Sequence, residues 1–356
     1  MRLLFFLALL PACTETVEIT GTGYAEATAA GPDGIELPLA IWYPADVTEA
    51  DVQAEYALGI TGDAWADAPP ATGPFPIIVN SHGNGGARHA GAVLFEEWAA
   101  AGYVVVSLDH VGNTFTDRPS VNEWVDIYIR RPADLAAAYT EVVSMSEAED
   151  GVLSGMVDAE TLILSGHSTG GATVILASGG TLNRATVLIA CGANQIGGNA
   201  CTIAESDDSE EIDLTPAGLP DPVATIAMAP LNGNLFSPSL DMAGASLVVV
   251  GTRDDVTPSG SNATPLFEAM PSPKTLVELQ GANHYAFATI CGVPELSDLL
   301  PSVASQCDDP SYMSEADAID ATAAISLEFM SKWVAQDEDA DVDAVAAGFD
   351  VTIEAE

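Results

Sequence analysis

Stretches that are apolar throughout alternate with stretches of helical spacing along most of this chain. Residues 76–79, 103–106 and 247–250 are runs of apolar residues, each bounded by turn or polar residues. A strand that is apolar on both faces has to be covered on both faces, which is typical of parallel sheets. The sequence therefore predicts an α/β fold, with a doubly wound, mainly parallel sheet, helices on both faces and one domain over nearly the whole chain.

Three further segments have clear local signals. Residues 36–45 alternate and end in Tyr-Pro-Ala, which predicts a strand in an antiparallel front section. Residues 130–148 are amphipathic and predict a helix with Pro132 at its start. Residues 314–336 predict a closing helix, with the Ser314 side chain as its N-cap.

These signals divide the chain into four parts, the third of which contains an insertion. Residues 1–12 are predicted to be a signal peptide, 13–35 an N-terminal segment, 36–336 the folded domain, and 337–356 an acidic C-terminal segment that is frayed or loosely packed. Residues 204–222 form an acidic insertion containing prolines. It is either a loop near the mouth of the functional site or a solvated surface insertion, and the second interpretation is favoured.

The charge excludes some partners. The chain has 52 acidic and 9 basic residues, a formal net charge of −43. Such a surface repels phosphate backbones and anionic headgroups, so nucleic acid is not an expected partner. Self-repulsion on this scale is tolerated best where salt screens it, which favours a saline setting. The alternative is that the acidity only maintains solubility.

The N-terminus predicts export. Arg2 precedes an apolar run over residues 3–10, too short for a permanent membrane span. Residues 10–13, Leu-Pro-Ala-Cys, resemble a bacterial lipobox, which would make Cys13 the lipidated first residue of a cell-envelope lipoprotein. The alternative is a periplasmic or secreted protein with plain cleavage nearby. Contact with a membrane is expected only through this anchor.

Four further cysteines suit an oxidising compartment. Cys191, Cys201, Cys291 and Cys307 allow three disulfide pairings, of which the two local ones, 191–201 and 291–307, are the simplest. A metal site is disfavoured because no C-x-x-C occurs and no histidine stands at ligand spacing to these cysteines. No metal or cofactor is therefore expected.

A G-x-S-x-G pentapeptide lies between an apolar strand and a helix. Ser168 stands at its centre, and Gly166 and Gly170 are the small neighbours that a sharp strand-to-helix bend requires. The helix that follows offers the backbone N–H of Thr169 to a developing oxyanion. Ser168 is therefore a candidate nucleophile.

Three more polar loops follow predicted strands. Residues 81–86, Ser-His-Gly-Asn-Gly-Gly, form either a glycine-rich turn or an oxyanion loop in which Asn84 supplies the second N–H, with Gly85 as the next candidate. Asp254 follows a later strand and suits a carboxylate that orients an imidazole, although the adjacent Asp255 is an alternative. His284 leaves the next strand. The order Ser, Asp, His along the chain is that of the α/β-hydrolase type.

The other four histidines are weaker candidates for the base. His82 belongs to the predicted oxyanion loop, and His167 stands beside the serine rather than facing it. His89 lies at an expected helix start and is predicted to be solvated. His110 ends a strand and could line the pocket, but it precedes the serine in the chain. Only His284 follows both the nucleophile and the acid.

At these residues the chain resembles the α/β-hydrolase superfamily from about Glu36 to Val334. The segments SHGNGGAR and AAAGYVVVSLDHVGNT are similar to the platelet-activating-factor acetylhydrolase and predicted dienelactone hydrolase group. The segment MPSPKTLVELQGANHYAF is also similar to bacterial cutinases and polyester hydrolases. The resemblance implies a metal-free triad of Ser168, Asp254 and His284. The oxyanion donors would be the N–H groups of Asn84 and Thr169.

The resemblance implies a serine ester hydrolase that forms an acyl-enzyme on short-chain or lipid-like carboxylic esters. The sequence departs from true dienelactone hydrolases, which carry cysteine where Ser168 stands. It departs from polyester hydrolases at Asn84, where they often carry an aromatic residue. The alternatives are a cutinase or polyester hydrolase, an acyltransferase on the same fold, and a binding lipoprotein without turnover.

Overall fold

The computed structural model describes residues 19–48, 51–206, 208–291, 293 and 301–356. The expected signal peptide, residues 1–12, and the lipidation candidate Cys13 lie outside the described residues. Within the described part of the chain, no helix combines the length and the apolar character that crossing a membrane requires.

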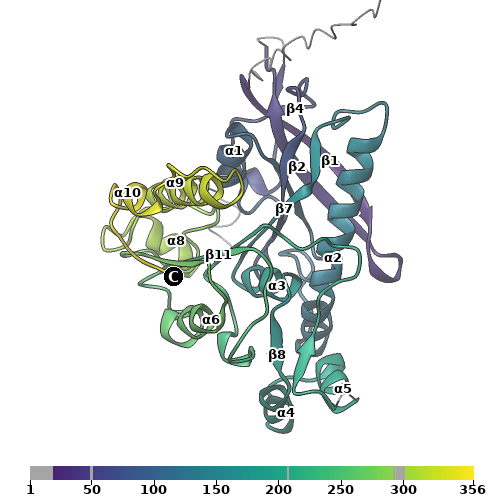
Figure 1. Ribbon diagram of the computed structural model, residues 1–356, viewed down its shortest axis with the longest axis vertical. Helices are drawn as coiled ribbons and strands as arrows, with labels where there is room; N and C mark the ends of the chain where they lie inside the picture. The colour runs from purple at the N-terminus through teal and green to yellow at the C-terminus, as the bar shows by residue number, and fades with distance from the viewer. Residues whose placement is uncertain (1–18, 49–50, 207, 292, 294–300) are drawn as a thin grey trace, which may run out of the picture.

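One eleven-stranded sheet forms the centre of the molecule (Figure 1). Its strand order is β13-β12-β11-β10-β7-β5-β6-β2-β1-β4-β3. From β12 to β6, every neighbouring pair is parallel. A separate two-stranded sheet joins β8 to β9. The strands are β1 Gly21–Ala30, β2 Glu36–Ala45, β3 Val52–Gln53, β4 Trp65–Ala66, β5 Phe75–Ser81, β6 Val104–Leu108, β7 Val157–His167, β8 Thr181–Asn183, β9 Glu211–Asp213, β10 Ala224–Met228, β11 Ala245–Gly251, β12 Lys274–Leu279 and β13 Val351–Ala355.

Helices cover both faces of the large sheet. Side chains of successive strand residues point to opposite faces, so Ile77 and Val79 pack in one core with α2 and α3, whereas Ile78 packs in another with α1 and α9. The prediction of an α/β fold with a mainly parallel, doubly covered sheet is confirmed.

The α-helices are α1 Ala92–Ala100, α2 Val121–Glu147, α3 Thr169–Ala177, α4 Arg184–Gly192, α5 Gly198–Ser206, α6 Ala263–Ala269, α8 Pro301–Cys307, α9 Glu315–Trp333 and α10 Val342–Ala346. Short 3₁₀ helices occupy Pro32–Gly34, Ala57–Gly59, Gly233–Leu235 and Ser259–Ser261.

The antiparallel front section is also confirmed. Strand β2 pairs antiparallel with β6 on one side and with β1 on the other. The β1–β2 pairing runs from Gly21↔Ala45 to Ala30↔Glu36, over the full length of both strands. The expected N-terminal segment, 13–35, therefore supplies a strand of the domain itself.

The expectation that residues 337–356 pack loosely is wrong. This segment contains α10 and then β13, which pairs antiparallel with β12 from Thr275↔Ala355 to Leu279↔Val351. The Lys274 ammonium forms an ion pair with the Glu356 carboxylate at 3.0 Å. Most of the acidic residues that suggested fraying are exposed side chains of α10 and of the turns around it, and only Glu354 lies in β13 itself.

Pro132 does not begin the helix that contains it. Helix α2 begins after Ser120, where the side chains and backbone N–H groups of Ser120 and Glu123 form a capping box, and Pro132 lies inside the helix. The strong cap lies upstream of the segment that showed clear amphipathic spacing. At the other end of the domain, the Ser314 side chain accepts a hydrogen bond from the Asp317 N–H and caps α9, which confirms that prediction.

The four remaining cysteines form the two local disulfides, Cys191–Cys201 and Cys291–Cys307. The first pair joins α4 to α5, next to the acidic insertion. Apart from residue 207, the insertion is described: it includes the end of α5 and strand β9, and Ala204 and Ile212 are buried. It is therefore a partly buried surface unit whose strand β9 pairs with β8, a strand outside the insertion.

We expect removal of residues 351–356 to destabilise the protein and to promote its association. Without β13, the backbone N–H and C=O groups of β12 become an open edge that another chain can pair with. The thermal midpoint of unfolding should fall, and light scattering should increase near it. The exposed substitution Glu354→Gln, which keeps the strand, is the control. A truncated protein with the wild-type midpoint would contradict the role assigned to β13.

Candidate active site

Ser168 lies on a sharp, strained turn between β7 and α3. Its φ of 57° and ψ of −117° are rarely adopted by residues other than glycine. A side chain at position 166 would clash with the Gly170 backbone, and one at position 170 with the Ser81 carbonyl, so both positions require glycine. The Ser168 N–H donates to the Met228 carbonyl at 2.8 Å, which ties the turn to β10.

The structure brings Ser168, His284 and Asp254 into one hydrogen-bonded chain. The Ser168 Oγ lies 2.9 Å from His284 Nε2, and His284 Nδ1 lies 2.8 Å from Asp254 Oδ2. All three side chains are nearly buried; Ser168 is 7% exposed. An imidazole held between a hydroxyl and a carboxylate can take the hydroxyl proton while the carboxylate stabilises the resulting imidazolium.

Asp254 rather than Asp255 contacts the imidazole. The Asp254 Oδ1 accepts the backbone N–H groups of Val256 and Thr257 at 2.9 and 2.7 Å, whereas Asp255 is exposed. Burial alone would raise the pKa of Asp254. The hydrogen bond and charge of His284, with the donors of Thr257, outweigh burial and hold that pKa below its ordinary value. The carboxylate therefore stays ionised in the neutral range.

Thr257 is a member of the site that sequence reasoning missed. Its hydroxyl lies 2.8 Å from Asp254 Oδ2, 3.1 Å from His284 Nδ1 and 3.1 Å from the Ala229 carbonyl. The Thr257 hydroxyl thus contacts one carboxylate oxygen, Oδ2, while the backbone N–H groups hold the other, Oδ1. Its closeness to Asp254 in the segment Asp-Asp-Val-Thr-Pro was a usable signal, because Thr and Asp side chains often close such tight turns.

His167 does not compete for the role of the base. Its Nε2–H donates to the His284 carbonyl at 2.8 Å, and the two rings lie 4.8 Å apart. Burial, followed by the charge of His284, lowers the pKa of His167 to about 3, so its ring is neutral. His167 thus holds the backbone of His284 in place beside the serine, a role that the sequence did not indicate.

The loop after β5 lies against the serine. A Cβ added at Gly83 would be 3.3 Å from the Ser168 Cβ, and Asn84 lines the same pocket as Ser168. The Asn84 Oδ1 accepts a hydrogen bond from Asn113 Nδ2 at 2.7 Å. Thr169 is the first residue of α3, where backbone N–H groups have no acceptor within the helix.

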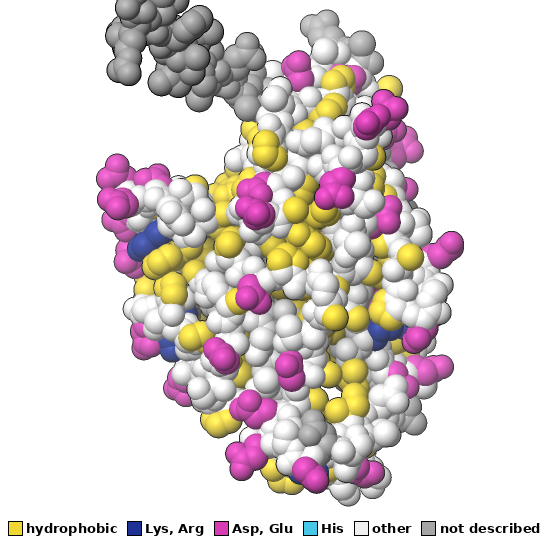
Figure 2. Space-filling model, turned by 45° about the vertical axis from the view of Figure 1, so that its right-hand side comes forward, with side chains coloured by type: hydrophobic (Ala, Val, Ile, Leu, Met, Phe, Trp, Pro, Cys, Tyr) yellow, Lys and Arg dark blue, Asp and Glu magenta, His cyan; other side chains and the backbone are white. Residues whose placement is uncertain are grey.

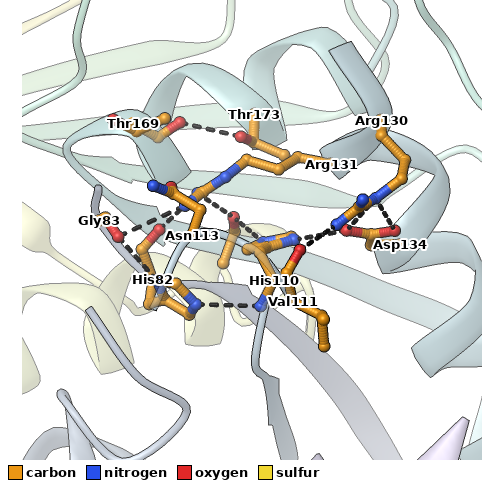
Figure 3. A network of polar contacts seen from close by, with 11 residues as sticks. His82, Gly83, His110, Val111, Asn113, Arg130, Arg131, Asp134, Thr169 and Thr173 are labelled. Atoms are coloured by element: carbon orange, nitrogen blue, oxygen red, sulfur yellow. Dashed lines mark hydrogen bonds and ion pairs between the residues drawn. The ribbon is translucent and has the colours of Figure 1, made fainter. Parts of the chain in front are cut away.

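The buried guanidinium of Arg131 donates hydrogen bonds to the backbone of the loop after β5 (Figure 3). Arg131 is fully buried; its Nη1 donates to the His82 carbonyl at 2.6 Å, and its Nη2 donates to Asn113 Oδ1 at 2.7 Å and to the Gly83 carbonyl at 3.4 Å. The His82 Nδ1–H donates to the Gly83 carbonyl at 2.7 Å, and His82 Nε2 accepts the His110 N–H at 3.1 Å. Sequence reasoning missed Arg131 because charged residues on an amphipathic helix usually face solvent.

His110 belongs to this network and does not line the pocket. Its Nδ1 lies 2.9 Å from Asp134 Oδ2 and its Nε2 lies 2.8 Å from Ser81 Oγ, and the ring is fully buried. Burial, then the positive charges of Arg131 and Arg130, lowers the pKa of His110 well below its ordinary value. The pocket-lining alternative for His110 is therefore wrong.

The catalytic candidates open into a pocket of about 560 Å³. Its walls come from the Ser81–Gly86 loop, from the segment around Phe115 and Arg118, and from residues 284–290. None of the described residues of the acidic insertion lines it, so the interpretation of that insertion as a loop at the mouth of this pocket is not supported. The full lining is Ile60, Gly83, Asn84, Gly85, Gly86, Ala87, Ala90, Asn113, Phe115, Arg118, Pro119, Trp124, His167, Ser168, Val256, His284, Tyr285, Ala288, Thr289 and Ile290.

The comparisons with known proteins add no family assignment. No protein-family model matches the chain, and no curated protein matches it. Among the residues that the structure describes, no group of three or more His, Cys, Asp or Glu side chains could hold a metal ion. The geometry of the site is therefore the basis for proposing a function.

His89 is buried, which corrects the expectation that it is solvated. Its Nε2 lies 2.7 Å from the Tyr24 hydroxyl, and the ring stacks on Tyr56. Tyr24 comes from β1, a strand that the sequence did not assign to the domain, so the cover over His89 could not be anticipated. Burial, then the charge of Arg88, lowers the pKa of His89 to about 4.

We expect His89→Gln to make the protein less sensitive to acid. The unfolded chain binds a proton at His89 near pH 6.5 and the folded chain only near pH 4, so this residue removes stability as the pH falls between these values. The loss should reach about 2–3 kcal/mol at pH 4. Urea unfolding at pH 4, 5, 6 and 7 gives the free energy of unfolding of both proteins. Between pH 7 and pH 4, the wild type should lose more of this free energy than the variant. Parallel stability curves would contradict the burial of a neutral His89.

Proposed function

We propose that this protein is a serine ester hydrolase with an α/β-hydrolase fold. The observation that carries the proposal is the chain of hydrogen bonds from Ser168 Oγ to His284 Nε2, and from His284 Nδ1 to Asp254 Oδ2, with Ser168 and His284 lining a pocket of about 560 Å³. The order of these residues, each after a strand of the parallel centre, supports the fold assignment.

In the proposed reaction, His284 removes the Ser168 proton as Oγ attacks the ester carbonyl carbon. The carbonyl π electrons move to oxygen and form a tetrahedral oxyanion. When the oxyanion collapses, the bond to the alcohol oxygen breaks and His284 gives its proton to that oxygen. Water, deprotonated by His284, then attacks the acyl-enzyme and releases the carboxylic acid, and the proton returns to Ser168.

The proposed oxyanion donors are the backbone N–H groups of Thr169 and Asn84. The N–H of Asn84 and the carbonyl of Gly83 belong to one trans peptide group, so they point in opposite directions. That carbonyl accepts hydrogen bonds from His82 and Arg131 on the buried side. The N–H is thereby directed away from the network, and donors on the carbonyl also strengthen it as a donor. His82 and Arg131 are positioning residues in this proposal.

Two disulfides support the proposed export to an oxidising compartment, as a cell-envelope lipoprotein or as a secreted protein. A polyester hydrolase or an acyltransferase would use the same three side chains and would differ only in substrate or acceptor. A binding protein without turnover would not need an imidazole within hydrogen-bond distance of Ser168.

We expect Ser168→Ala to abolish ester hydrolysis. Loss of the nucleophile should lower kcat on p-nitrophenyl butyrate by at least ~10³-fold, and the variant should not react with a fluorophosphonate probe. The control is Ser165→Ala in β7, the strand that leads to Ser168, because the buried Ser165 hydroxyl makes no hydrogen bond. Wild-type hydrolysis by Ser168→Ala would overturn the proposal. If the wild-type protein reacts with the probe but hydrolyses no ester, the result would favour the acyltransferase.

We expect Arg131→Lys to lower kcat more than it changes KM. A lysine keeps the charge, but a single ammonium cannot donate at once to the His82 carbonyl, the Gly83 carbonyl and Asn113 in the same geometry. A displaced Asn84 N–H should reduce kcat by about tenfold or more, because each oxyanion donor matters mainly in the transition state. Thermal unfolding of the same samples separates this effect from instability. An unchanged kcat would refute the positioning role.

A further inference from the structure

Arg118 is the one cation of the described chain that has no protein partner. Each of the other Lys and Arg side chains in the described ranges makes a hydrogen bond, an ion pair or a ring contact. Their partners are Glu26 and Asp109 for Arg88, Asp134 for Arg130, His82 and Asn113 for Arg131, Ala204 for Arg184, Ser311 and Tyr312 for Arg253, Glu356 and Phe267 for Lys274, and Trp333 for Lys332.

Arg118 also lies in a functional place. It is exposed, and it lines the pocket into which Ser168 and His284 open. The acidic side chains nearest to it in the chain are used elsewhere: Asp117 Oδ2 accepts the Gly112 N–H at 2.7 Å, and Glu123 Oε2 accepts the Ser120 N–H at 2.8 Å. Among the residues that the structure describes, no carboxylate or carbonyl accepts a hydrogen bond from the Arg118 guanidinium.

Solubility does not explain an arginine in this position. The protein has 52 acidic and 9 basic residues, and the face in Figure 2 carries acidic side chains over most of its extent with few basic ones among them. The other seven cations of the described chain all form hydrogen bonds, ion pairs or ring contacts within the protein. A free guanidinium in the wall of the pocket instead offers a ligand a planar fork of N–H donors that matches carboxylate and phosphate oxygens.

We propose that Arg118 binds an anionic group, a carboxylate or a phosphate, on the substrate, so that the protein acts on negatively charged esters. This inference rests on the proposed ester hydrolase. The apolar side chains of Phe115, Trp124 and Ile290 line the same pocket and can contact the hydrocarbon part that separates the anion from the ester. In a field made negative by the rest of the surface, Arg118 provides the local attraction that such a substrate requires.

The test compares matched charged and neutral esters. One pair is the mono-4-nitrophenyl ester of adipic acid and its methyl-capped diester; a second pair carries a phosphonate and its dimethyl ester in place of the carboxylate. In Arg118→Gln, the ratio of kcat/KM for the charged ester to that for the neutral ester should fall about three- to tenfold, a modest effect because Arg118 is exposed. Arg118→Lys should retain part of the ratio, and Arg118→Glu should lower it further.

The control is Arg184→Gln, which removes the same charge at α4, outside the lining of the pocket, and should leave the ratio unchanged. Raising the salt concentration from 0.1 to 1 M should weaken the wild-type preference, because the screening length shortens from about 10 to about 3 Å. The larger effect between the two pairs identifies the preferred anion.

The outcomes separate this inference from the function on which it rests. If Arg118→Gln hydrolyses the neutral ester but keeps the wild-type ratio in both pairs, the anionic substrate is wrong and the ester hydrolase stands. If the wild-type protein hydrolyses neither ester of either pair, the proposed function fails and the inference fails with it. An equal fall of the ratio in Arg184→Gln would assign the effect to net charge and overturn the role of Arg118.

Discussion

The strained backbone at Ser168 is the constraint on which the rest of the site depends. A positive φ at a residue with a side chain costs of the order of 1–3 kcal/mol and persists only where surrounding contacts hold it. Here the Ser168 N–H binds the Met228 carbonyl, and its own carbonyl accepts the N–H groups of Ala172 and Leu231. These bonds reach β10, α3 and the loop after β10, so the turn is held from three sides. The close approach of Gly170 to the Ser81 carbonyl adds β5, which places the loop with Asn84 beside the serine.

The loop that contains Asn84 packs against Arg131, a cation that is fully buried. Burial lowers the pKa of Arg131 to about 9, against the opposing effect of Asp134, and burial raises the pKa of Asp134 to about 6. A buried charge is tolerated only where its donors find acceptors, and Arg131 finds them chiefly in the backbone carbonyls of the loop. The arrangement is therefore specific. If the loop moves, the His82 and Gly83 carbonyls leave the guanidinium, and the buried cation keeps Asn113 Oδ1 but loses two of its acceptors.

The parts that the sequence predicts well are those governed by local pattern. Apolar strands, the glycine-flanked serine and the order of Asp254 and His284 follow from spacing and turn chemistry, and the structure brings these side chains together. The missed features depend on contacts between distant segments. His89 is covered by Tyr24 from β1, Arg131 is covered by a loop that precedes it in the chain, and β13 is retained by pairing with β12. No local pattern in an acidic C-terminal segment indicates that it has a strand to pair with.

Two of the few basic residues connect the terminal segments to the domain. Arg88 joins Glu26 of β1 to Asp109 after β6, and Lys274 of β12 joins Glu356 at the end of β13. Both terminal segments that the sequence left outside the domain are thus linked to it by a cation. In a chain with a net charge of −43, an edge strand carrying carboxylates meets repulsion from the rest of the surface. A partly buried ion pair at the strand is screened less by salt than the repulsion between exposed carboxylates. Salt therefore weakens the repulsion between carboxylates more than it weakens these ion pairs. We expect the pairing of the terminal strands with the sheet to become more stable as ionic strength rises.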